Sequence, residues 1–441
     1  MWAIKNLTIE YFLKKFSNLY PKSIDLSLDR IKILLNKLGN PEKNLPPVVH
    51  VAGTNGKGST VSFLKNIFSN SGLKVQTYTS PHLISFNERI RLADGIIKDD
   101  FLIDVLTECN FYNQDEPISF FEITTAAAFL AFSKSEGDIL VLEVGLGGRL
   151  DTTNVIEKPL LSTITPVSLD HTEFLGKTLE QIAHEKGGII KNNSSVIIGP
   201  QNKTVMKILN EIAYQKGNNT FLHGRDWDFT INDDGSFFLN YLGSSISLPK
   251  PNLVGLHQIS NAAQAAACAL SQKEFKITNE DLATGIKEVN WPGRLQKLYL
   301  NFPDEKIINL EVWVDGAHNS NAALNLSKSI KLINKDSENY TVLILGMLNN
   351  KDYASYLKHF EKIIDYLICI PVPNCKTSQD PEKLKVFAEQ ELAIPTETSI
   401  NFIKALQKTI SKMPAKKTTI IISGSLYLVG EILKIADYKF K

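Results

Sequence analysis

The chain has 441 residues, of which 43% are hydrophobic and 22% are charged. This length predicts two or three domains, and the hydrophobic content is enough to build packed cores. Lys and Arg number 48 and Asp and Glu number 47, a formal net charge of +1. No whole-protein field therefore attracts nucleic acid or an anionic membrane, and any polyanion must be held by a local site.

The sequence shows no targeting or membrane segment. Residues 1–16 mix Lys, Glu and Asn with apolar residues, unlike a signal peptide, and no apolar run approaches the roughly 18 residues that cross a bilayer. The four cysteines form no C-x-x-C pair, which argues against a disulfide framework or a zinc site. We expect a soluble, cytoplasmic enzyme that binds neither nucleic acid nor membrane, and nothing requires more than a monomer.

The first part of the chain alternates apolar runs with helical periods, as parallel sheets flanked by helices do. Between 223 and 248, short alternating segments with turn signals predict an antiparallel ribbon added to the first domain. A helical pair is expected after it, at 258–270 and 279–287. The remaining elements predicted in this part are strands at 47–52, 73–79, 138–144, 160–165 and 195–198 and helices at 59–71 and 121–133.

A second alternating stretch begins near Leu298. Pro and Gly in the loop 290–294 end the preceding helix, so we place a domain boundary there. The predicted fold class is α/β, with one domain of residues 1–296 and a second of residues 297–441, and a cleft between domains is a common place for a ligand. The strands predicted in the second domain are 307–314, 341–346, 366–370 and 418–422.

The strongest local motif is Val-Val-His-Val-Ala-Gly-Thr-Asn-Gly-Lys-Gly-Ser-Thr, residues 48–60. A buried strand, a Gly-rich turn and a helix direct backbone N–H groups and the positive helix end at one point, with Lys57 beside it. This pattern is typical of a phosphate-binding loop. Gly58 stands where a P-loop has its magnesium-binding Ser or Thr, so the metal's hydroxyl ligand is expected elsewhere. The alternative is a turn that binds nothing.

Three residues at or near the carboxyl ends of different predicted strands carry metal-binding atoms: Ser80, Glu143 and His171. Oxygen and imidazole donors suit Mg²⁺, which takes few protein ligands and leaves room for phosphate oxygens. Each residue also has a structural interpretation. Ser80 can belong to a plain Ser-Pro turn before a solvated Glu-Arg-Ile-Arg stretch, Glu143 can pair with Arg149, and His171 can be a structural histidine.

In the second predicted domain, Asp315 and His318 lie together at the end of a strand, and Arg294 supplies a cation at the boundary. Together they indicate a second half-site. Gly145 and Gly147 raise the possibility of a dinucleotide site, but the third Gly of that fingerprint is absent, so a dehydrogenase is disfavoured.

In the order and spacing of its motifs, the chain resembles the folylpolyglutamate synthase and dihydrofolate synthase family over nearly its full length. This family lies within the Mur ligase group of ATP-dependent amide ligases. The resemblance implies an N-terminal P-loop ATPase-type domain, with a mostly parallel sheet and a small antiparallel ribbon, and a C-terminal Rossmann-like α/β domain. It rests on Gly-Thr-Asn-Gly-Lys-Gly-Ser (53–59), Ser-Pro-His-Leu (80–83), Glu-Val-Gly-Leu-Gly-Gly-Arg-Leu-Asp (143–151), Leu-Asp-His-Thr (169–172), Glu-Lys-Gly-Gly-Ile (185–189), Ser-Asn-Ala-Ala (260–263), Pro-Gly-Arg (292–294) and Asp-Gly-Ala-His-Asn (315–319).

The resemblance also implies which residues bind the nucleotide and the metal. Lys186 stands where the family has a carbamylated lysine that helps bind a second Mg²⁺, with an ordinary phosphate-contacting cation as the alternative. With Lys57 and His318 it forms the implied catalytic set. ATP would be bound by Thr54, Asn55, Gly56, Lys57, Asn261, Arg294 and Asp315, and Mg²⁺ by Ser80, Glu143 and His171.

Three further segments, which we call the acceptor segments, match those that bind the pterin substrate in the family. They are Ser23, Ile24, Asp25 and Leu26, then Ser119, Phe120, Phe121 and Glu122, and finally Leu150, Asp151 and Thr152. One departure concerns the second domain. The family often has Asp before Lys351, and Asn350 stands there instead, which weakens a role for Lys351 in binding glutamate or nucleotide.

The activity implied by the resemblance is an ATP-dependent ligase with ATP as co-substrate. It would join L-glutamate to dihydropteroate, and to the γ-carboxyl of tetrahydrofolate, through an acyl phosphate. Residues 147–151 resemble the bifunctional bacterial members. The alternatives are a monofunctional folylpolyglutamate synthase, a cell-wall ligase that acts on a muramyl peptide, and a nucleotide-binding switch without ligase activity.

Overall fold

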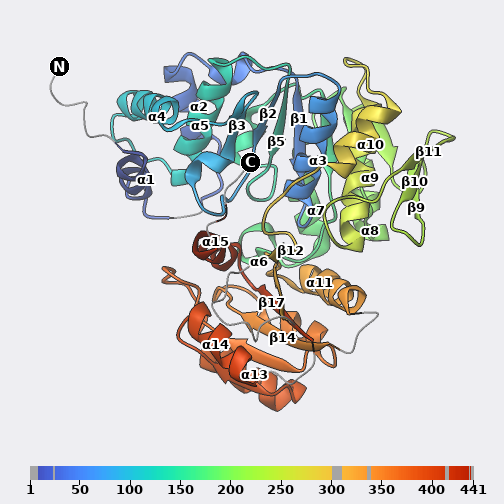
Figure 1. Ribbon diagram of the computed structural model, residues 1–441. Coiled ribbons are helices and arrows are strands. Elements are labelled where there is room, and N and C mark those ends of the chain that lie inside the picture. The colour runs from blue at the N-terminus through green and yellow to red at the C-terminus, as the bar shows by residue number, and fades with distance from the viewer. Residues whose placement is uncertain are drawn as a thin grey trace. The chain divides into compact units, whose positions relative to one another are not determined.

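The computed structural model describes residues 8–22, 25–299, 310–334, 339–412, 417–436 and 438. The chain forms two compact units (Figure 1). The first contains Met1–Asn252 and Ile259–Val289, and the second contains Leu253–Gln258 and Asn290–Lys441. The second unit therefore begins within the predicted boundary loop, and it also takes in a short segment from before that loop.

An eight-stranded sheet runs through the first unit in the order β4-β3-β2-β5-β1-β6-β7-β8. Six neighbouring strands, β2, β5, β1, β6, β7 and β8, run parallel to one another. At one edge of the sheet, β3 pairs antiparallel with β2 and β4 pairs antiparallel with β3. The strands are β1 (Val48–Ala52), β2 (Val75–Tyr78), β3 (Ile90–Leu92), β4 (Gly95–Ile96), β5 (Ile139–Glu143), β6 (Leu161–Ile164), β7 (Ser195–Ile198) and β8 (Asn219–Leu222).

The five parallel strands predicted from the sequence are confirmed, and their positions explain where a ligand can bind. Strand β1 is flanked by β5 and β6, which both come much later in the chain. The turn after β1 therefore lies between the loops that follow β5 and β6. This is the switch point at the carboxyl edge of the sheet, where open α/β sheets bind their ligands.

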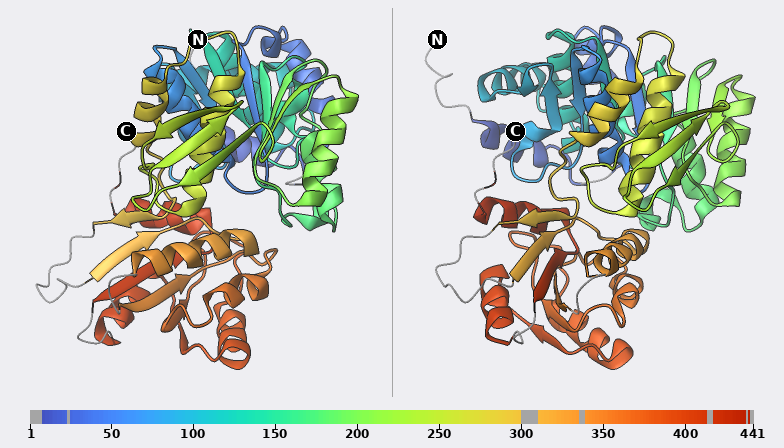
Figure 2. Two further views of the ribbon diagram at one scale, coloured as in Figure 1. Left: turned by 90° about the vertical axis from the view of Figure 1, so that its right-hand side faces the viewer. Right: turned by 45° about the vertical axis from the view of Figure 1, so that its right-hand side comes forward.

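The helices of the first unit surround this sheet (Figure 2). The helix predicted at 59–71 begins two residues earlier, at Lys57, because Gly56 adopts a left-handed conformation with φ of 88° and turns the chain into the helix. The helices are α1 (Ile9–Ser17), α2 (Asp29–Lys37), α3 (Lys57–Asn70), α4 (Asp99–Asn113), α5 (Phe120–Ser133), α6 (Thr172–Leu175), α7 (Leu179–Gly187), α8 (Lys203–Gln215), α9 (Leu256–Ser271) and α10 (Asn279–Lys287).

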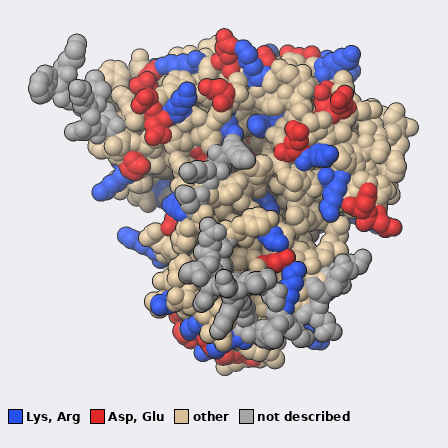
Figure 3. Space-filling view, viewed as in Figure 1, with Lys and Arg blue, Asp and Glu red and all other residues tan. Residues whose placement is uncertain are grey.

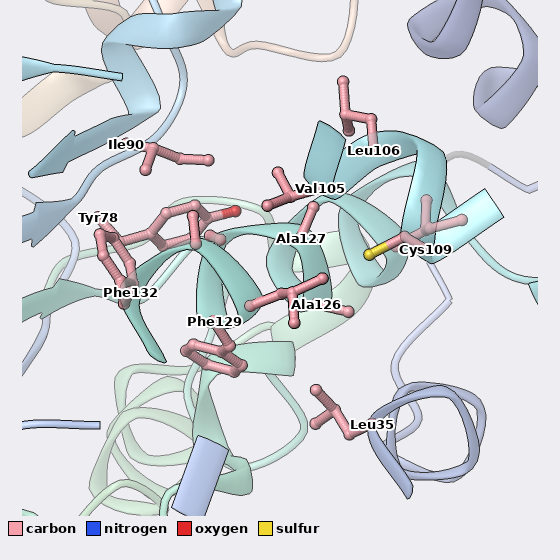
Figure 4. Packing of buried hydrophobic residues seen from close by; sticks show 14 of the residues in the cluster. Leu35, Tyr78, Ile90, Val105, Leu106, Cys109, Ala126, Ala127, Phe129 and Phe132 are labelled. Carbon is pink, nitrogen blue, oxygen red and sulfur yellow. The ribbon is translucent and has the colours of Figure 1, made fainter. Parts of the chain in front are cut away.

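A large buried cluster joins the sheet to α4 and α5 (Figure 4). Tyr78 of β2 and Leu142 of β5 belong to the same cluster as Ala127 and Phe129 of α5 and Leu106 of α4, and all five are 0% exposed. The alanines of α5 have small side chains, which allows close approach to its neighbours. This packing fixes the beginning of α5, which carries the second acceptor segment.

A separate three-stranded sheet confirms the predicted antiparallel ribbon. Its order is β11-β10-β9. The turn between β9 and β10 contains Gly235 with φ of 85°, and Asp234 accepts a hydrogen bond from the Ser236 N–H at 2.9 Å. The strands are β9 (Trp227–Ile231), β10 (Phe237–Tyr241) and β11 (Ser244–Leu248).

The second unit is built on a six-stranded sheet with the order β12-β13-β17-β14-β15-β16, parallel except for β12. The predicted α/β class is thus confirmed; residues 307–309 of one predicted strand lie outside the described residues. The elements are β12 (Gln296–Leu298), β13 (Leu310–Val314), α11 (Ser320–Ile333), β14 (Tyr340–Leu345), α12 (Tyr353–Leu357), β15 (Tyr366–Cys369), α13 (Pro381–Leu392), β16 (Thr396–Thr398), α14 (Phe402–Lys412), β17 (Thr418–Ser423) and α15 (Leu426–Ile435).

Charged side chains of both signs are interspersed over the face seen in Figure 3. This distribution agrees with a formal net charge of +1 and shows no block of a single sign on that face. Among the helices that the structure describes, none combines the length and the apolar character needed to cross a lipid bilayer.

Gly285 offers a test of helix packing in the first unit. Helix α10 packs against α3, and a Cβ at Gly285 would lie 2.7 Å from both N and Cα of Ile67. Helix propensity favours Ala over Gly by about 1 kcal/mol. Because backbone atoms cannot move aside without displacing their helix, we expect Gly285→Ala to lower the free energy of unfolding by about 1–3 kcal/mol.

Urea unfolding followed by circular dichroism measures this change. Lys287→Ala is the control, since Lys287 is exposed on the same helix and its replacement should leave stability unchanged or slightly raised. An increased unfolding midpoint for Gly285→Ala would show that propensity outweighs packing at this position.

Candidate active site

Two glycines shape the turn 53–56 between β1 and α3. Gly53 has φ of 148°, and a Cβ there would overlap Oγ1 of Thr165. Gly56 has φ of 88°, and a Cβ there would overlap Oδ1 of Asn261 on α9. Larger residues would therefore clash with the loop after β6 or with α9, as well as being strained. The structure places the predicted nucleotide-binding residue Asn261 directly beside this turn.

Hydrogen bonds join the turn to the loop that follows β6. The backbone N–H groups of Thr54 and Asn55 donate to the carbonyl oxygen of Pro166 at 3.0 and 3.3 Å. The Thr54 hydroxyl donates to the carbonyl of Ser168 and accepts from the Ser168 N–H, both at 3.0 Å. The loops after β1 and β6 thus form one connected edge of the sheet.

Two lysines donate to the same backbone carbonyl. Nζ of Lys57 lies 3.1 Å from the oxygen of Gly53 and 3.2 Å from that of Thr54, and Nζ of Lys186 on α7 lies 2.8 Å from the Gly53 oxygen. Lys186 is 4% exposed. Burial above all, and then the charge of Lys57, lower the pKa of Lys186 to about 7, although Asp170 and other carboxylates act in the opposite direction. A large fraction of Lys186 is therefore an uncharged amine at neutral pH.

Ser80 and Glu143 lie together, as the metal-site prediction requires. They follow or end the adjacent strands β2 and β5, which pair Tyr78 with Leu142. The Ser80 N–H donates to Oε2 of Glu143 at 3.0 Å, and Glu143 is 4% exposed. The alternative ion pair of Glu143 with Arg149 is wrong.

Arg149 instead binds Oε1 of Glu185, with Nε at 3.0 Å and Nη2 at 2.8 Å. Glu185 lies next to Lys186, which binds the carbonyl of Gly53, so the ion pair forms near the turn 53–56. Glu185 precedes Lys186 on α7, so this ion pair also fixes the helix that carries the buried amine.

His171 lies in the loop after β6, at the same edge of the sheet as Ser80 and Glu143. It has φ of 49° and stands immediately before α6. Its N–H donates to Oδ1 of Asp170 at 2.9 Å. The structure thus joins Ser80 to Glu143 directly and brings His171 to this edge. In the described ranges, no three His, Cys, Asp or Glu residues form a metal-sized group by themselves.

Arg30 connects the first two acceptor segments. Its Nη1 lies 2.9 Å from Oδ2 of Asp25, and its Nε lies 3.0 Å from Oε2 of Glu122, which is 1% exposed. Oε2 of Glu122 also accepts the N–H of Ser119 at 2.8 Å in a capping box at the start of α5. Asp25 and Glu122 therefore have a common partner, while Ser23 and Ile24 lie outside the described residues.

The third acceptor segment also contacts α5. The hydroxyl of Thr152 donates to Oγ1 of Thr125 at 3.0 Å, and the hydroxyl of Tyr78 lies 3.0 Å from the same atom. The carboxylate of Asp151 accepts the N–H groups of Leu146 at 2.8 Å and of Thr153 at 3.0 Å. Asp151 therefore holds the glycine-rich turn in place, whereas its neighbour Thr152 binds the helix.

The remaining members of these segments are apolar. Phe121 packs against the glycine-rich turn so closely that a Cβ at Gly145 would overlap its ring. Leu26 packs, partly buried, on the cluster that contains α7. Leu150 is partly exposed, and so is Phe120, which packs on the cluster of Figure 4. Glycine at position 145 thus leaves the space that the ring of Phe121 occupies.

In the second unit, the structure brings Arg294, Asp315 and His318 together. The carboxylate of Asp315 accepts the N–H of Leu295 through Oδ2 and the N–H of Ala317 through Oδ1, each at 2.8 Å. Nδ1 of His318 lies 2.9 Å from the carbonyl oxygen of Gly316. A Cβ at Gly316 would lie 2.7 Å from Nη1 of Arg294, so this guanidinium lies over the same turn.

Sequence reasoning missed the residues that connect the segments. Arg30 is separated from Glu122 by 92 positions, and no motif marks it. Tyr78 and Thr125 are likewise ordinary members of a strand and a helix. Only the capping box of Ser119 and Glu122, a short-range pattern, was available as a signal of how α5 begins.

The chain is similar to known ligases in both sequence and structure. Residues 51–269 match the family Mur ligase middle domain, and residues 298–435 match the family Dihydrofolate synthetase, C-terminal domain. A dihydrofolate synthase/folylpolyglutamate synthase of Haemophilus influenzae is 32% identical over 428 residues, 94% of each chain.

Two solved structures are similar over 98% of each chain. Escherichia coli FolC in complex with DHPP and ADP gives a TM-score of 0.87 at 29% identity. A bifunctional folylpolyglutamate synthase/dihydrofolate synthase of Yersinia pestis, complexed with AMPPNP and Mn ion, gives a TM-score of 0.85 at 26% identity. These two titles name nucleotide ligands for both relatives and a divalent metal for one.

The lowered pKa of Lys186 predicts a pH dependence of stability. The folded pKa of about 7 lies below the ordinary value of 10.5, so between these values the unfolded chain binds more protons than the folded one. Stability therefore rises with pH across this range. In Lys186→Met this contribution disappears, so the free energy of unfolding of the wild type, relative to the variant, should increase from pH 7 to pH 10.

The measurement is urea unfolding in CO₂-free buffer without nucleotide, so that the free amine is observed. Lys177→Met is the control, because Lys177 is exposed and its replacement should leave the pH dependence unaltered. A constant difference between wild type and Lys186→Met over this range would contradict the assignment.

Proposed function

The chain belongs to the dihydrofolate synthase/folylpolyglutamate synthase family of ATP-dependent ligases, and we propose on that premise that it joins L-glutamate to two acceptors. These are dihydropteroate and the γ-carboxyl group of tetrahydrofolate. The observation that carries the proposal is the convergence of Lys57 and Lys186 on the carbonyl of Gly53, at the edge where Ser80 binds Glu143. Such an edge suits a nucleotide triphosphate and its metal.

The reaction needs a nucleotide-binding edge because a carboxylate does not condense with an amine in water unless ATP first activates it. An oxygen of the acceptor carboxylate attacks the γ-phosphorus of ATP, an O–P bond forms, the β–γ bridging bond breaks and ADP leaves. The neutral α-amine of glutamate then attacks the acyl carbon and loses a proton, and the C–O bond breaks to release phosphate. Donors that offset repulsion between the anionic reactants lower the barrier.

In this proposal Gly56 supplies a backbone N–H group to the triphosphate and Lys57 supplies a positive charge. Thr54 and Asn55, whose N–H groups bind the carbonyl of Pro166, hold the turn in the shape that surrounds the phosphates. Asn261, beside Gly56, limits the space around the turn. Lys57 donates to carbonyls of its own turn, which fixes its ammonium group over the end of β1. A preorganised charge in this position acts on a phosphoryl group without further rearrangement.

The donors at this edge fit Mg²⁺. The hydroxyl of Ser80 and the carboxylate of Glu143 are hard oxygen ligands, and His171 supplies an imidazole from the neighbouring loop. Mg²⁺ bound there would neutralise phosphate charge. The Mn ion and AMPPNP of the Yersinia pestis relative support a divalent metal together with the nucleotide.

The acceptor segments form the proposed pterin site, in which Arg30 holds Asp25 to Glu122 and Thr125 holds Thr152. In the second unit, we assign Arg294 and Asp315 to the nucleotide and His318 to orienting the amine of glutamate. The side chain of Asp315 binds two N–H groups of its own unit, so it acts on the nucleotide through the loop that it holds. A cytoplasmic monomer remains our expectation, and light scattering tests the monomer.

Incubation with ATP, labelled glutamate and each acceptor tests the activity. Dihydropteroate and tetrahydrofolate should both gain label, with ADP formed only when acceptor and glutamate are present. Lys57→Ala should reduce turnover by about 10²-fold or more, because it removes a positive charge that offsets the negative charge of the transition state. Thermal unfolding of the variant controls for stability.

The alternatives give different results in the same assay. Labelling of tetrahydrofolate alone would indicate a monofunctional folylpolyglutamate synthase, and labelling of a muramyl peptide would indicate a cell-wall ligase. Phosphate release that does not depend on glutamate would indicate a nucleotide switch. Full activity of Lys57→Ala would overturn the role of the turn 53–56.

Lys186 completes the proposal as a carbamylated residue that helps bind a second Mg²⁺. Its pKa of about 7 leaves much of the amine neutral, and a neutral amine attacks CO₂. The N–C bond forms as one C–O π bond of CO₂ opens, and the nitrogen loses one proton to solvent, so the neutral amine becomes a carbamate with one negative charge. Relative to the ammonium form, two protons are released and a positive charge is replaced by a negative one. This exchange removes the repulsion with Lys57 at the Gly53 carbonyl.

Lys186→Ala should therefore lose about 10²-fold or more of the activity, and short carboxylic acids such as acetate should partly restore it by supplying the missing negative charge. Lys186→Arg is the matched variant, since it keeps a cation but cannot form the carbamate, and it should stay inactive with or without acetate. Normal turnover of Lys186→Arg would show that a phosphate-contacting cation is sufficient.

A further inference from the structure

Arg89 is a buried cation that no step described above uses. It ends a short 3-10 helix, Phe86–Arg89, and is 8% exposed. Its carbonyl accepts the N–H of Thr79 at 3.0 Å, so its backbone lies opposite the residue before Ser80. Its neighbour Ile90 pairs with Tyr78 across β3 and β2, and both side chains appear in Figure 4. The sequence alternative of a solvated Glu-Arg-Ile-Arg stretch is therefore wrong for Arg89.

The guanidinium of Arg89 lies among aromatic rings. Its Cζ lies 5.2 Å from the ring centroid of Phe86 and 5.9 Å from that of Phe120, at the start of α5. Its Nε donates to Nδ1 of His82 at 2.9 Å. An accepting Nδ1 means that this histidine is not doubly protonated, so the hydrogen bond supplies no negative charge and no neutralisation.

Within the described part of the chain, Arg89 has no carboxylate partner. Three other arginines of the first unit do: Arg30 pairs with Asp25 and Glu122, Arg149 with Glu185, and Arg225 with Asp226. Glu88, the acidic residue next to Arg89 in sequence, binds backbone N–H groups instead. Glu88 accepts the N–H groups of Leu83, Ile84 and Ser85 at 2.8, 2.8 and 2.5 Å.

A guanidinium withdrawn from water without a counter-charge is unfavourable, and an anionic ligand removes that penalty. The planar fork of arginine matches a carboxylate through two parallel hydrogen bonds. The aromatic rings of Phe86 and Phe120 beside it are suited to an aryl group attached to that carboxylate. The surroundings of Arg89 therefore favour an aryl carboxylate over a simple inorganic anion.

The location of Arg89 agrees with this ligand. The backbone of Arg89 binds Thr79, the residue before Ser80, and Ser80 binds Glu143 at the proposed metal edge. Its guanidinium lies beside Phe120 of the second acceptor segment. Arg89 therefore connects the proposed metal edge to the proposed acceptor site.

We propose that Arg89 binds the acceptor carboxylate that receives the phosphoryl group, and that it continues to bind the acyl phosphate formed from it. This inference rests on the proposed function, because it needs an acceptor that carries a carboxylate. In the transfer, the carboxylate oxygen gains the O–P bond as ADP leaves, and the guanidinium stays paired with an anion throughout. Arg89 would then act in both reactions, since both phosphorylate a carboxylate at the same edge.

A ligand-truncation cycle tests the pairing directly. The dissociation constant of dihydropteroate is compared with that of its analogue in which hydrogen replaces the benzoate carboxylate. The wild type should prefer the carboxylate by about 10- to 100-fold, as expected for a charge-assisted pair that is partly withdrawn from water. In Arg89→Met that preference should fall to about one, while binding of the truncated analogue stays the same.

Two further variants separate this role from a structural one. Arg89→Lys keeps the charge but not the fork, so it should retain part of the carboxylate preference. Arg225→Met, at an exposed arginine before β9, is the matched control and should behave as the wild type. Binding of ADP should be the same in all four proteins, which shows that the fold and the nucleotide turn are intact.

The outcomes distinguish the two proposals. If wild type forms labelled product but Arg89→Met keeps the full carboxylate preference, the assignment of Arg89 is overturned and the proposed function stands. If the wild type neither binds dihydropteroate nor turns over any acceptor, both proposals fail. Should Arg89→Met not fold, an Arg89→Lys variant with unaltered preference and kcat would overturn the assignment in its place.

Discussion

The carbonyl oxygen of Gly53 accepts hydrogen bonds from two lysines, and the organisation of the first unit depends on this contact. Lys57 comes from the same turn, whereas Lys186 comes from α7, 133 residues away in sequence. Their mutual repulsion contributes to the lowered pKa of Lys186. The arrangement is possible because glycine at 53 allows the loop after β6 to approach, as the position of Thr165 shows. A polyanion bound there relieves a repulsion that the fold itself creates.

Two carboxylates near this edge bind backbone N–H groups. Glu88 holds three N–H groups of its loop, and Asp151 holds the glycine-rich turn. A carboxylate used in this way fixes a loop instead of pairing directly with a cation. Arg89 is where this effect is clearest, since its acidic neighbour is used by the backbone.

The sequence was sufficient for the interior strands and for the glycine-rich turn between β1 and α3, because both leave local patterns. Strands such as β1 and β5 are buried along their whole length and read as apolar runs, whereas the edge strands β3 and β4 have only three and two residues. The sequence predicted Ser80 and Glu143 at or near the carboxyl ends of different strands, and in the structure the Ser80 N–H binds Glu143. The sequence did not exclude an ion pair between Glu143 and Arg149, because the observed pairing of Arg149 with Glu185 depends on how α7 packs.

The same limit explains why Arg30 and Arg89 could not be told apart beforehand. Each is an arginine in an unremarkable local pattern, and each meets its partners only in the packed structure, where Arg89 is buried and Arg30 is partly buried. Arg30 then meets Asp25 and Glu122, whereas Arg89 meets Phe86, Phe120 and the neutral nitrogen of His82. The distinction that we propose between Arg30, which has carboxylate partners, and Arg89, which would bind a ligand, therefore rests on the charge of their partners. That charge balance is a property of the packed structure, so it becomes visible only when long-range contacts are known.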